Sequence, residues 1–114
     1  MKVKKYDLFY ITLENGIGSE QFGRRIVCIS QNNIGNLHSP TTIVSIVTSA
    51  DKANYMPTIV NIGKNFGLTK ESNVHCEQIF TIDKSRLQDY VGFISDEDLQ
   101  NKINKALSIS LGLS

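Results

Sequence analysis

Runs of β-branched and aromatic residues recur along most of the chain and predict strands. They fall at residues 7–13, 25–31, 41–49, 58–62, 73–82 and 90–94. Such side chains favour a pleated, half-buried surface, and residues 41–49 carry the strongest signal because they are mostly Thr, Ile and Val. The segments between these runs are rich in Gly, Asn, Pro and Ser and predict loops at residues 14–24, 32–40, 50–57 and 63–72. Residues 83–87 predict a turn or a single helical turn.

The hydrophobic period changes near the end of the chain. Leu99, Ile103, Ala106 and Leu107 follow one another at helical spacing. Ser95 is the predicted N-cap, the acidic residues 96–98 suit the first turn, and a glycine at position 112 can end the helix. Because no helices alternate with the strands, a parallel α/β fold is excluded. We therefore predict a mainly β fold, a small twisted barrel of about five to seven strands with one C-terminal helix.

Length and composition narrow the class of protein. A chain of 114 residues with 40% hydrophobic and 20% charged residues is typical of one globular domain, here predicted over residues 1–114. The net charge of +1 argues against coating nucleic acid by charge alone, so a nucleic-acid site must be local. No long apolar run is present, which predicts a cytoplasmic protein without a membrane span. Cys28 and Cys76 form no Cys-x-x-Cys motif, so a disulfide scaffold and a zinc knuckle are excluded, and both thiols are expected to be buried and inert.

Two short segments carry a more specific signal. Residues 18–25 read Gly-Ser-Glu-Gln-Phe-Gly-Arg-Arg, and residues 77–83 read Glu-Gln-Ile-Phe-Thr-Ile-Asp. Together with Ser-Pro-Thr at residues 39–41 and Thr-Ser at residues 48–49, they resemble the MazF/PemK (Kid) toxins of bacterial toxin–antitoxin pairs. The resemblance runs from about residue 3 to residue 111 and is closest to the Gram-positive, EndoA-like branch.

The resemblance implies a fold and an activity. Members of this family are homodimeric SH3-like barrels that cut single-stranded RNA, chiefly mRNA, at short sequences and stop translation. They work without a metal or another cofactor, and a MazE-like antitoxin blocks the RNA groove. The family's catalytic arginine falls on Arg25 and its catalytic threonine on Thr48. Three positions depart from the family pattern and bear on specificity and rate: Ile26 replaces a proline, Phe80 a common basic residue, and His75 an arginine found in some relatives.

The chemistry of RNA cleavage explains the two transferred residues. Attack by the 2′-OH gives a phosphorane with extra negative charge, which the planar guanidinium of Arg25 can stabilise through two hydrogen bonds. The Thr48 hydroxyl can donate a further hydrogen bond. Without the resemblance, Arg25 would read as a solvated cation and Thr48 as an ordinary strand residue. Glu20 is a candidate base or a contact to a nucleobase, although a solvated loop carboxylate is an equal alternative. His75 is a candidate general acid, although a structural role is common for a strand histidine.

Base recognition needs side chains that stack on bases or bond to their edges. The candidates lie in loops expected to meet at one mouth of the barrel: Ser19, Gln21, Phe22, Asn32, Asn33, Met56 and Gln78. For the two asparagines, plain turn formation explains the residue type equally well. The two histidines lack the paired spacing of a metal site, so no metal is expected.

Two other functions stay open. Some barrel toxins poison a protein target such as DNA gyrase through a tryptophan-containing tail, but this chain has no Trp. A degenerate relative could bind RNA or an antitoxin without cutting, which the residues at positions 26 and 80 allow.

Overall fold

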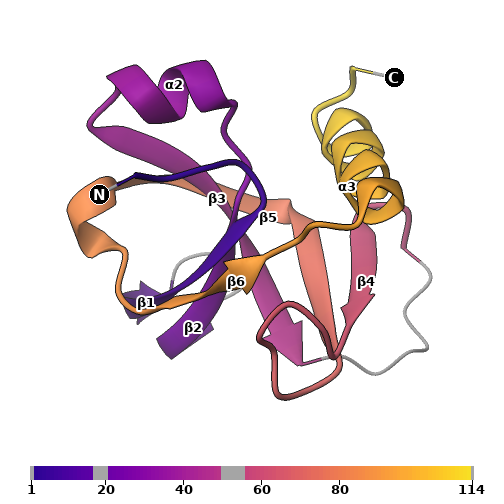
Figure 1. The fold of residues 1–114 in the computed structure, drawn as a ribbon, viewed down its shortest axis with the longest axis horizontal. Helices are drawn as coiled ribbons and strands as arrows, with labels where there is room; N and C mark the ends of the chain where they lie inside the picture. The colour runs from indigo at the N-terminus through magenta and orange to yellow at the C-terminus, as the bar shows by residue number, and fades with distance from the viewer. Residues whose placement is uncertain (1, 17–20, 50–55, 114) are drawn as a thin grey trace.

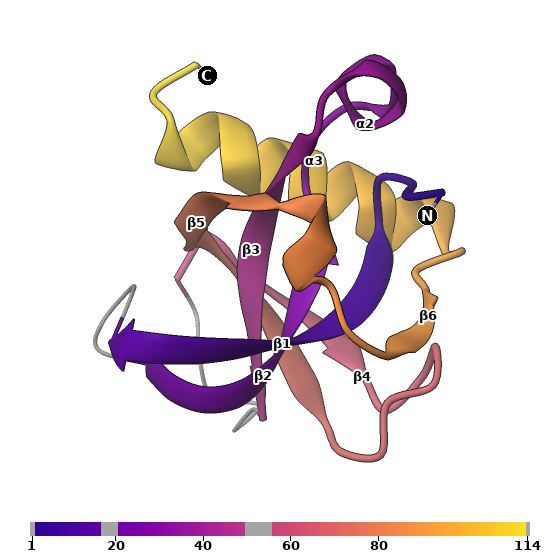
Figure 2. The same ribbon diagram turned by 90° about the vertical axis from the view of Figure 1, so that its left-hand side faces the viewer.

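One curled antiparallel sheet forms the body of the protein. The computed structural model describes residues 2–16, 21–49 and 56–113, and within these the strands are β1 (Asp7–Gly16), β2 (Gln21–Ile29), β3 (Thr41–Ser49), β4 (Ile59–Gly63), β5 (Ser72–Asp83) and β6 (Tyr90–Phe93). They lie in the order β4-β5-β3-β2-β1-β6. Figures 1 and 2 show the sheet curling on itself as a half-barrel with a helix across one side. The predicted small β barrel with a C-terminal helix is confirmed.

Strand β3 occupies the centre of the sheet. It pairs with β2 on one side and with β5 on the other. The pairing with β5 changes register between Ser45 and Ile46, whose partners are Ile79 and His75, so residues 76–78 have no partner in β3. A bulge of this kind bends a strand and re-aims its side chains. It divides β5 into one part that pairs with β4 and another that continues toward the 3₁₀ turn Lys84–Arg86.

Apolar side chains are buried on both faces of the sheet. On one face, Leu8, Cys28 and Val47 pack with Ile103 and the rest of one buried cluster under the C-terminal helix. Their neighbours along the same strands point the other way and fill the curl of the sheet, with Ile11, Val27, Ile29, Val44, Ile46 and Ile82 at the centre of a second cluster. Burial on both faces fits the high content of β-branched residues in β3.

Two helices complete the fold, and each corrects a sequence prediction. Residues 32–40 were predicted as a loop, but they contain α2 (Asn33–His38), which the Asn32 side chain caps by accepting a hydrogen bond from Gly35 N. Helix α3 (Glu97–Ser110) begins after Asp96 rather than Ser95, because the Asp96 carboxylate accepts the Leu99 N–H at 3.1 Å. The predicted loop at residues 14–24 is shorter, because β1 and β2 stay paired as far as Leu13 and Gly23.

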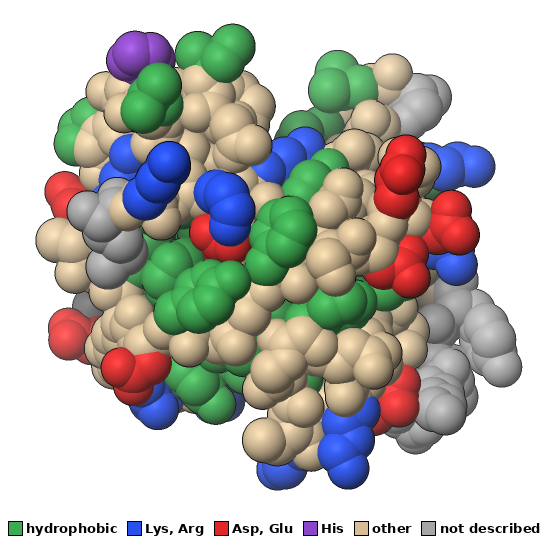
Figure 3. Space-filling view, viewed as in Figure 1, with side chains coloured by type: hydrophobic (Ala, Val, Ile, Leu, Met, Phe, Trp, Pro, Cys, Tyr) green, Lys and Arg blue, Asp and Glu red, His purple; other side chains and the backbone are tan. Residues whose placement is uncertain are grey.

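The surface carries apolar side chains at two corners. Ile34 and Leu37 of α2 are 77% and 73% exposed, and Leu111 and Leu113 follow the end of α3. Figure 3 shows hydrophobic side chains standing out on α2 at the upper left and again near the C-terminal end. Across the described residues, no helix is long and apolar enough to cross a membrane.

Candidate active site

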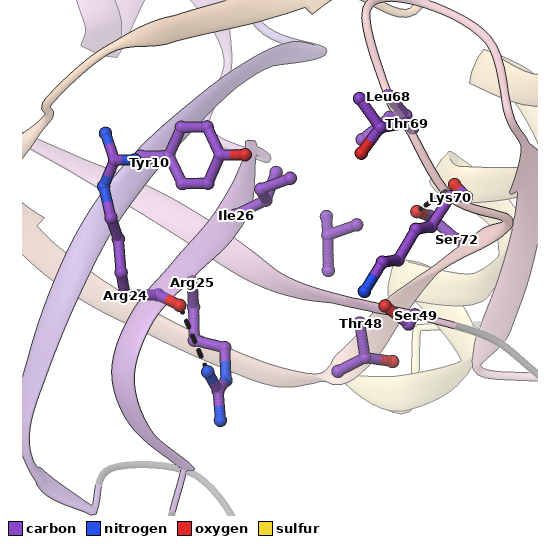
Figure 4. Close-up of a pocket in the computed structure, with 11 residues that line it drawn as sticks. Tyr10, Arg24, Arg25, Ile26, Thr48, Ser49, Leu68, Thr69, Lys70 and Ser72 are labelled. Carbon is purple, nitrogen blue, oxygen red and sulfur yellow. Dashed lines mark hydrogen bonds between the residues drawn. The ribbon is translucent and has the colours of Figure 1, made fainter.

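Arg25, in the middle of β2, and Thr48, one residue before the end of β3, lie on neighbouring strands of the sheet. The antiparallel pairing of β2 with β3 ends with Ile26 opposite Val47, and the next residues along the two strands are Arg25 and Thr48. Both side chains are half-buried and leave the sheet on the same side, as Figure 4 shows. Arg25 Nη1 also donates a hydrogen bond to the Arg24 carbonyl oxygen at 3.1 Å. The two residues that the sequence assigned to catalysis are therefore brought together on rigid strands.

His75 joins this pair from β5. It lies opposite Ile46, two residues before Thr48, so the two side chains are diagonal neighbours on one face of the sheet. The Thr48 Oγ1 and His75 Nε2 atoms are 2.8 Å apart, within hydrogen-bonding distance. Arg25, Thr48 and His75 thus form a continuous row across three strands.

The surroundings of His75 disfavour protonation of its ring. Burial lowers the pKa of His75, and the nearby Glu77 carboxylate opposes this effect only in part. The Nδ1 atom is buried and has no hydrogen-bond partner among the described residues. A neutral imidazole carries one proton, so only one of its nitrogens can donate a hydrogen bond.

A cavity of about 510 Å³ lies beside the row. Residues from β1, β2, β3, the loop before β5 and the first position of β5 line it: Tyr10, Arg24, Arg25, Ile26, Val47, Thr48, Ser49, Leu68, Thr69, Lys70 and Ser72. In Figure 4 the Lys70 ammonium group extends toward Ser49 and Thr48. Sequence analysis missed Lys70, because it stands in an irregular segment without a periodic pattern or a motif.

Arg24 is engaged elsewhere at the rim of this cavity. Its guanidinium pairs with the Asp89 carboxylate, donates to Gln88 Oε1 and lies 3.9 Å above the Tyr10 ring centroid. These contacts hold Arg24 in a cation–π stack with Tyr10. Lys70, by contrast, has no salt-bridge partner among the described residues.

The remaining predicted residues occupy several places. Ser19 and Glu20 lie outside the described residues, as do the side chains of Gln21 and Phe22 at the start of β2. Met56 is exposed ahead of β4.

Gln78 lies in the bulge of β5, and its Oε1 atom is buried without a hydrogen-bond partner among the residues that the structure describes.

Asn32 and Asn33 lie away from the Arg25–Thr48 pair. They follow the end of β2, whereas Arg25 stands in the middle of that strand, so half of the strand separates them. Their side-chain oxygens accept hydrogen bonds from the backbone N–H groups of Gly35 at 2.8 Å and of Lys5 at 2.7 Å. The structure therefore does not bring these two residues to the mouth that holds Arg25 and Thr48.

Both cysteine side chains are buried, as predicted. Burial raises the pKa of the Cys28 thiol well above its usual range and that of Cys76 to about 12. Neither thiol is poised to act as a nucleophile. Within residues 2–16, 21–49 and 56–113, no three His, Cys, Asp or Glu side chains come together as metal ligands would.

A curled antiparallel sheet that carries an arginine and a threonine on two adjacent inner strands is the arrangement expected from the resemblance, and comparison with known families agrees. Residues 4–111 match the family described as PemK-like, MazF-like toxin of type II toxin–antitoxin system. The chain belongs to this family. The resemblance inferred from the two motifs is thereby confirmed.

Individual relatives are similar over nearly their whole length. The chain is 43% identical to the endoribonuclease EndoA of Bacillus subtilis, covering 99% of this chain and 97% of the relative. It is 40% identical to the endoribonuclease MazF of Staphylococcus saprophyticus, and the match covers 97% of this chain and 92% of that relative. Among solved structures, a mycobacterial endoribonuclease in complex with its cognate antitoxin superposes with a TM-score of 0.81 at 28% identity, covering 98% of this chain and 97% of that one.

Proposed function

We propose that this protein is the toxin of a toxin–antitoxin pair and a sequence-specific endoribonuclease that cuts single-stranded mRNA and thereby inhibits translation. The observation that carries the proposal is that Arg25 and Thr48, both half-buried, lie on adjacent strands and leave the sheet on the same side. Relatives with 40% and 43% identity carry the name endoribonuclease, which supports the same activity here. The catalytic unit is one domain that spans residues 1–114.

Arg25 and Thr48 can stabilise the negative charge that develops on the phosphate in the transition state. Attack of the ribose 2′-OH on the adjacent phosphorus forms one P–O bond and breaks the bond to the 5′ oxygen, which leaves a 2′,3′-cyclic phosphate and a 5′-OH. The Arg25 fork donates to two phosphate oxygens, and the Thr48 hydroxyl donates to the same group. Because both residues sit on strands, little reorganisation is needed as the charge develops.

Proton transfer is the other requirement, for which the sequence analysis gave Glu20 and His75 as candidates. A base must accept the 2′-OH proton, and an acid must protonate the departing 5′ oxygen. The Glu20 carboxylate belongs to the same Gly-rich segment as Arg25 and suits the role of base. No step requires a metal ion or another cofactor.

RNA binding is proposed for the surface around the cavity. Lys70 offers a charge to a backbone phosphate, while Ser19, Gln21, Phe22, Met56 and Gln78 are the candidates for contacts with bases. Asn32 and Asn33 are proposed to contact only a longer RNA that extends beyond the cavity.

Partners follow from the family. We propose a homodimer that a MazE-like antitoxin inactivates, and the exposed apolar side chains of α2 and the C-terminal end are surfaces suited to such contacts. The protein would act in the cytoplasm, where mRNA is translated.

Cleavage of a long, mostly unstructured RNA in excess EDTA tests this function. Wild type and Arg25→Ala are compared, and the cut sites are mapped by primer extension. Cuts at one recurring short sequence that disappear with Arg25→Ala support the proposal. If neither folded protein cuts, but both bind RNA or an antitoxin, the non-cleaving alternative replaces it, and cuts that persist in the variant indicate a contaminant.

A further inference from the structure

We propose that His75 is a positioning residue: its Nε2–H donates a hydrogen bond to the Thr48 hydroxyl oxygen and so directs the Thr48 hydroxyl proton toward the scissile phosphate. The inference rests on the proposed ribonuclease function, and it concerns the way in which one side chain prepares another. The 2.8 Å contact between Thr48 Oγ1 and His75 Nε2 carries it.

The environment of the second ring nitrogen selects the tautomer. The Nδ1 atom of His75 is buried and lacks a hydrogen-bond partner among the described residues. If Nδ1 held the proton, a buried donor would be left unsatisfied, an arrangement that folded proteins rarely tolerate. If Nε2 holds it, the proton reaches Thr48 and only a lone pair stays without a partner. The geometry therefore favours the tautomer in which Nε2 carries the proton.

This tautomer fixes the Thr48 hydroxyl. A hydroxyl group has one proton to donate and two lone pairs that accept. Once Oγ1 accepts from His75, its own proton cannot point back at the ring and must lie on another side. Arg25 stands across from Thr48 on β2, so a phosphate held between these strands receives both donors. Without the histidine, the hydroxyl rotates freely, and part of its donating capacity is lost when the charge develops.

The same geometry argues against direct proton transfer from His75 to RNA. A general acid must reach the leaving oxygen within hydrogen-bonding distance or through one water. The Nε2 atom is committed to Thr48, and Nδ1 is buried. Glu77, the charged neighbour on the same strand face, offsets only part of the burial effect that keeps the ring neutral.

A purely structural contact between β3 and β5 is the alternative, and substitution separates the two roles. His75→Leu removes the donor, whereas His75→Gln places an amide N–H near the position of Nε2 but cannot exchange a proton at neutral pH. Asn61→Leu is the matched control, because Asn61 Nδ2 donates to Asn73 Oδ1 at 3.0 Å and links β4 to β5 without contacting Thr48.

Single-turnover cleavage of the mapped RNA at saturating protein gives the readout. We expect His75→Leu to lower the rate about tenfold or more with RNA affinity kept, the loss typical of a weakened transition-state hydrogen bond. His75→Gln should recover most of that loss, and Asn61→Leu should cleave like the wild type. A rate for His75→Gln as low as that of His75→Leu, or a wild-type rate for His75→Leu, would overturn the proposal.

A second measurement does not depend on cleavage or on the folding of a variant. ¹⁵N NMR of histidine-labelled wild type at neutral pH should show Nε2 protonated and Nδ1 bare, and a proton on Nδ1 would overturn the assignment. If the wild type fails to cut RNA, the proposed function fails, while the NMR result still decides the hydrogen bond between Thr48 and His75.

Discussion

A backbone contact between the pocket loop and β6 offers a sharp test of the packing that supports the site. Gly67 begins the stretch that brings Leu68 and Lys70 to the cavity. A Cβ atom at Gly67 would lie 2.1 Å from the Val91 carbonyl oxygen, and one at Gly92 would lie 1.8 Å from the Phe66 carbonyl oxygen. Ordinary contacts of a Cβ begin at 3.4 Å, so alanine at either position must push the two backbones apart.

The size of the effect can be worked out by comparing three glycines. Gly67 has φ +89° and a close contact, Gly112 has φ +71° with nothing within 4 Å of the added Cβ, and Gly92 has the contact without a positive φ. A positive φ costs a non-glycine residue about 1–2 kcal/mol, and overpacking costs about 1–3 kcal/mol. Gly112→Ala should thus lose about 1–2 kcal/mol of unfolding free energy, Gly92→Ala about 1–3 and Gly67→Ala about 2–5.

Urea and thermal unfolding of the three variants measure these losses. One kcal/mol corresponds to a shift in Tm of about 4 °C for a domain near this size. Gly67→Ala should also weaken RNA binding, because the displaced loop carries Lys70, whereas Gly112→Ala should bind RNA like the wild type. Equal stability of Gly92→Ala and wild type would refute the reasoning, since the two backbones would then not be in contact.

Three further predictions concern charge, pH and the α2 corner. Lys70→Ala should weaken RNA binding and reduce the slope of log K against log salt by about 0.7, the value for one phosphate contact to a single strand, and an unchanged slope would exclude Lys70 from the interface. Burial lowers the pKa of His75 below 6.5 in the folded protein. As the pH falls to about 6.5, the unfolded chain therefore binds more protons than the folded protein, and the free energy of unfolding decreases. The wild-type Tm should therefore fall more than that of His75→Gln between about pH 7.5 and 5.5, and parallel decreases would contradict the assignment. Asn32→Ala should lower stability by about 1 kcal/mol through loss of the α2 cap, as measured by urea unfolding, and no loss would contradict the capping role.

Much of the fold follows from local pattern. The strand at residues 41–49 was predicted with its observed bounds, because its run of β-branched residues is buried on both faces. Helix α2 was missed, since six residues show no helical period and Asn32 serves equally well in a turn or a cap. The start of α3 was misplaced by one residue, because Ser95 and Asp96 are both good caps and only the structure shows which one accepts from the first turn.

The candidate site also has a part that could be proposed from the sequence and a part that only the structure shows. Arg25 and Thr48 were proposed as site residues because the family resemblance marks their positions, and the structure places them on adjacent strands. The contact of Thr48 with His75 could not be predicted, because it depends on the register of β5 against β3, which shifts at residues 76–78. Alternation along a strand gives the face of a side chain but not its partner across the sheet.

The most direct test of the central claim is the dependence of cleavage on the ribose 2′-OH. A short RNA that contains the mapped cut sequence is prepared with ribose or 2′-deoxyribose at the cleaved nucleotide, and single-turnover cleavage by the wild type is followed in EDTA. The account predicts that the ribose substrate is cut to a 2′,3′-cyclic phosphate and a 5′-OH, while the deoxyribose substrate binds with similar affinity and stays intact. Cleavage of both substrates at similar rates would contradict the assignment of Arg25 and Thr48 to an attack by the 2′-OH.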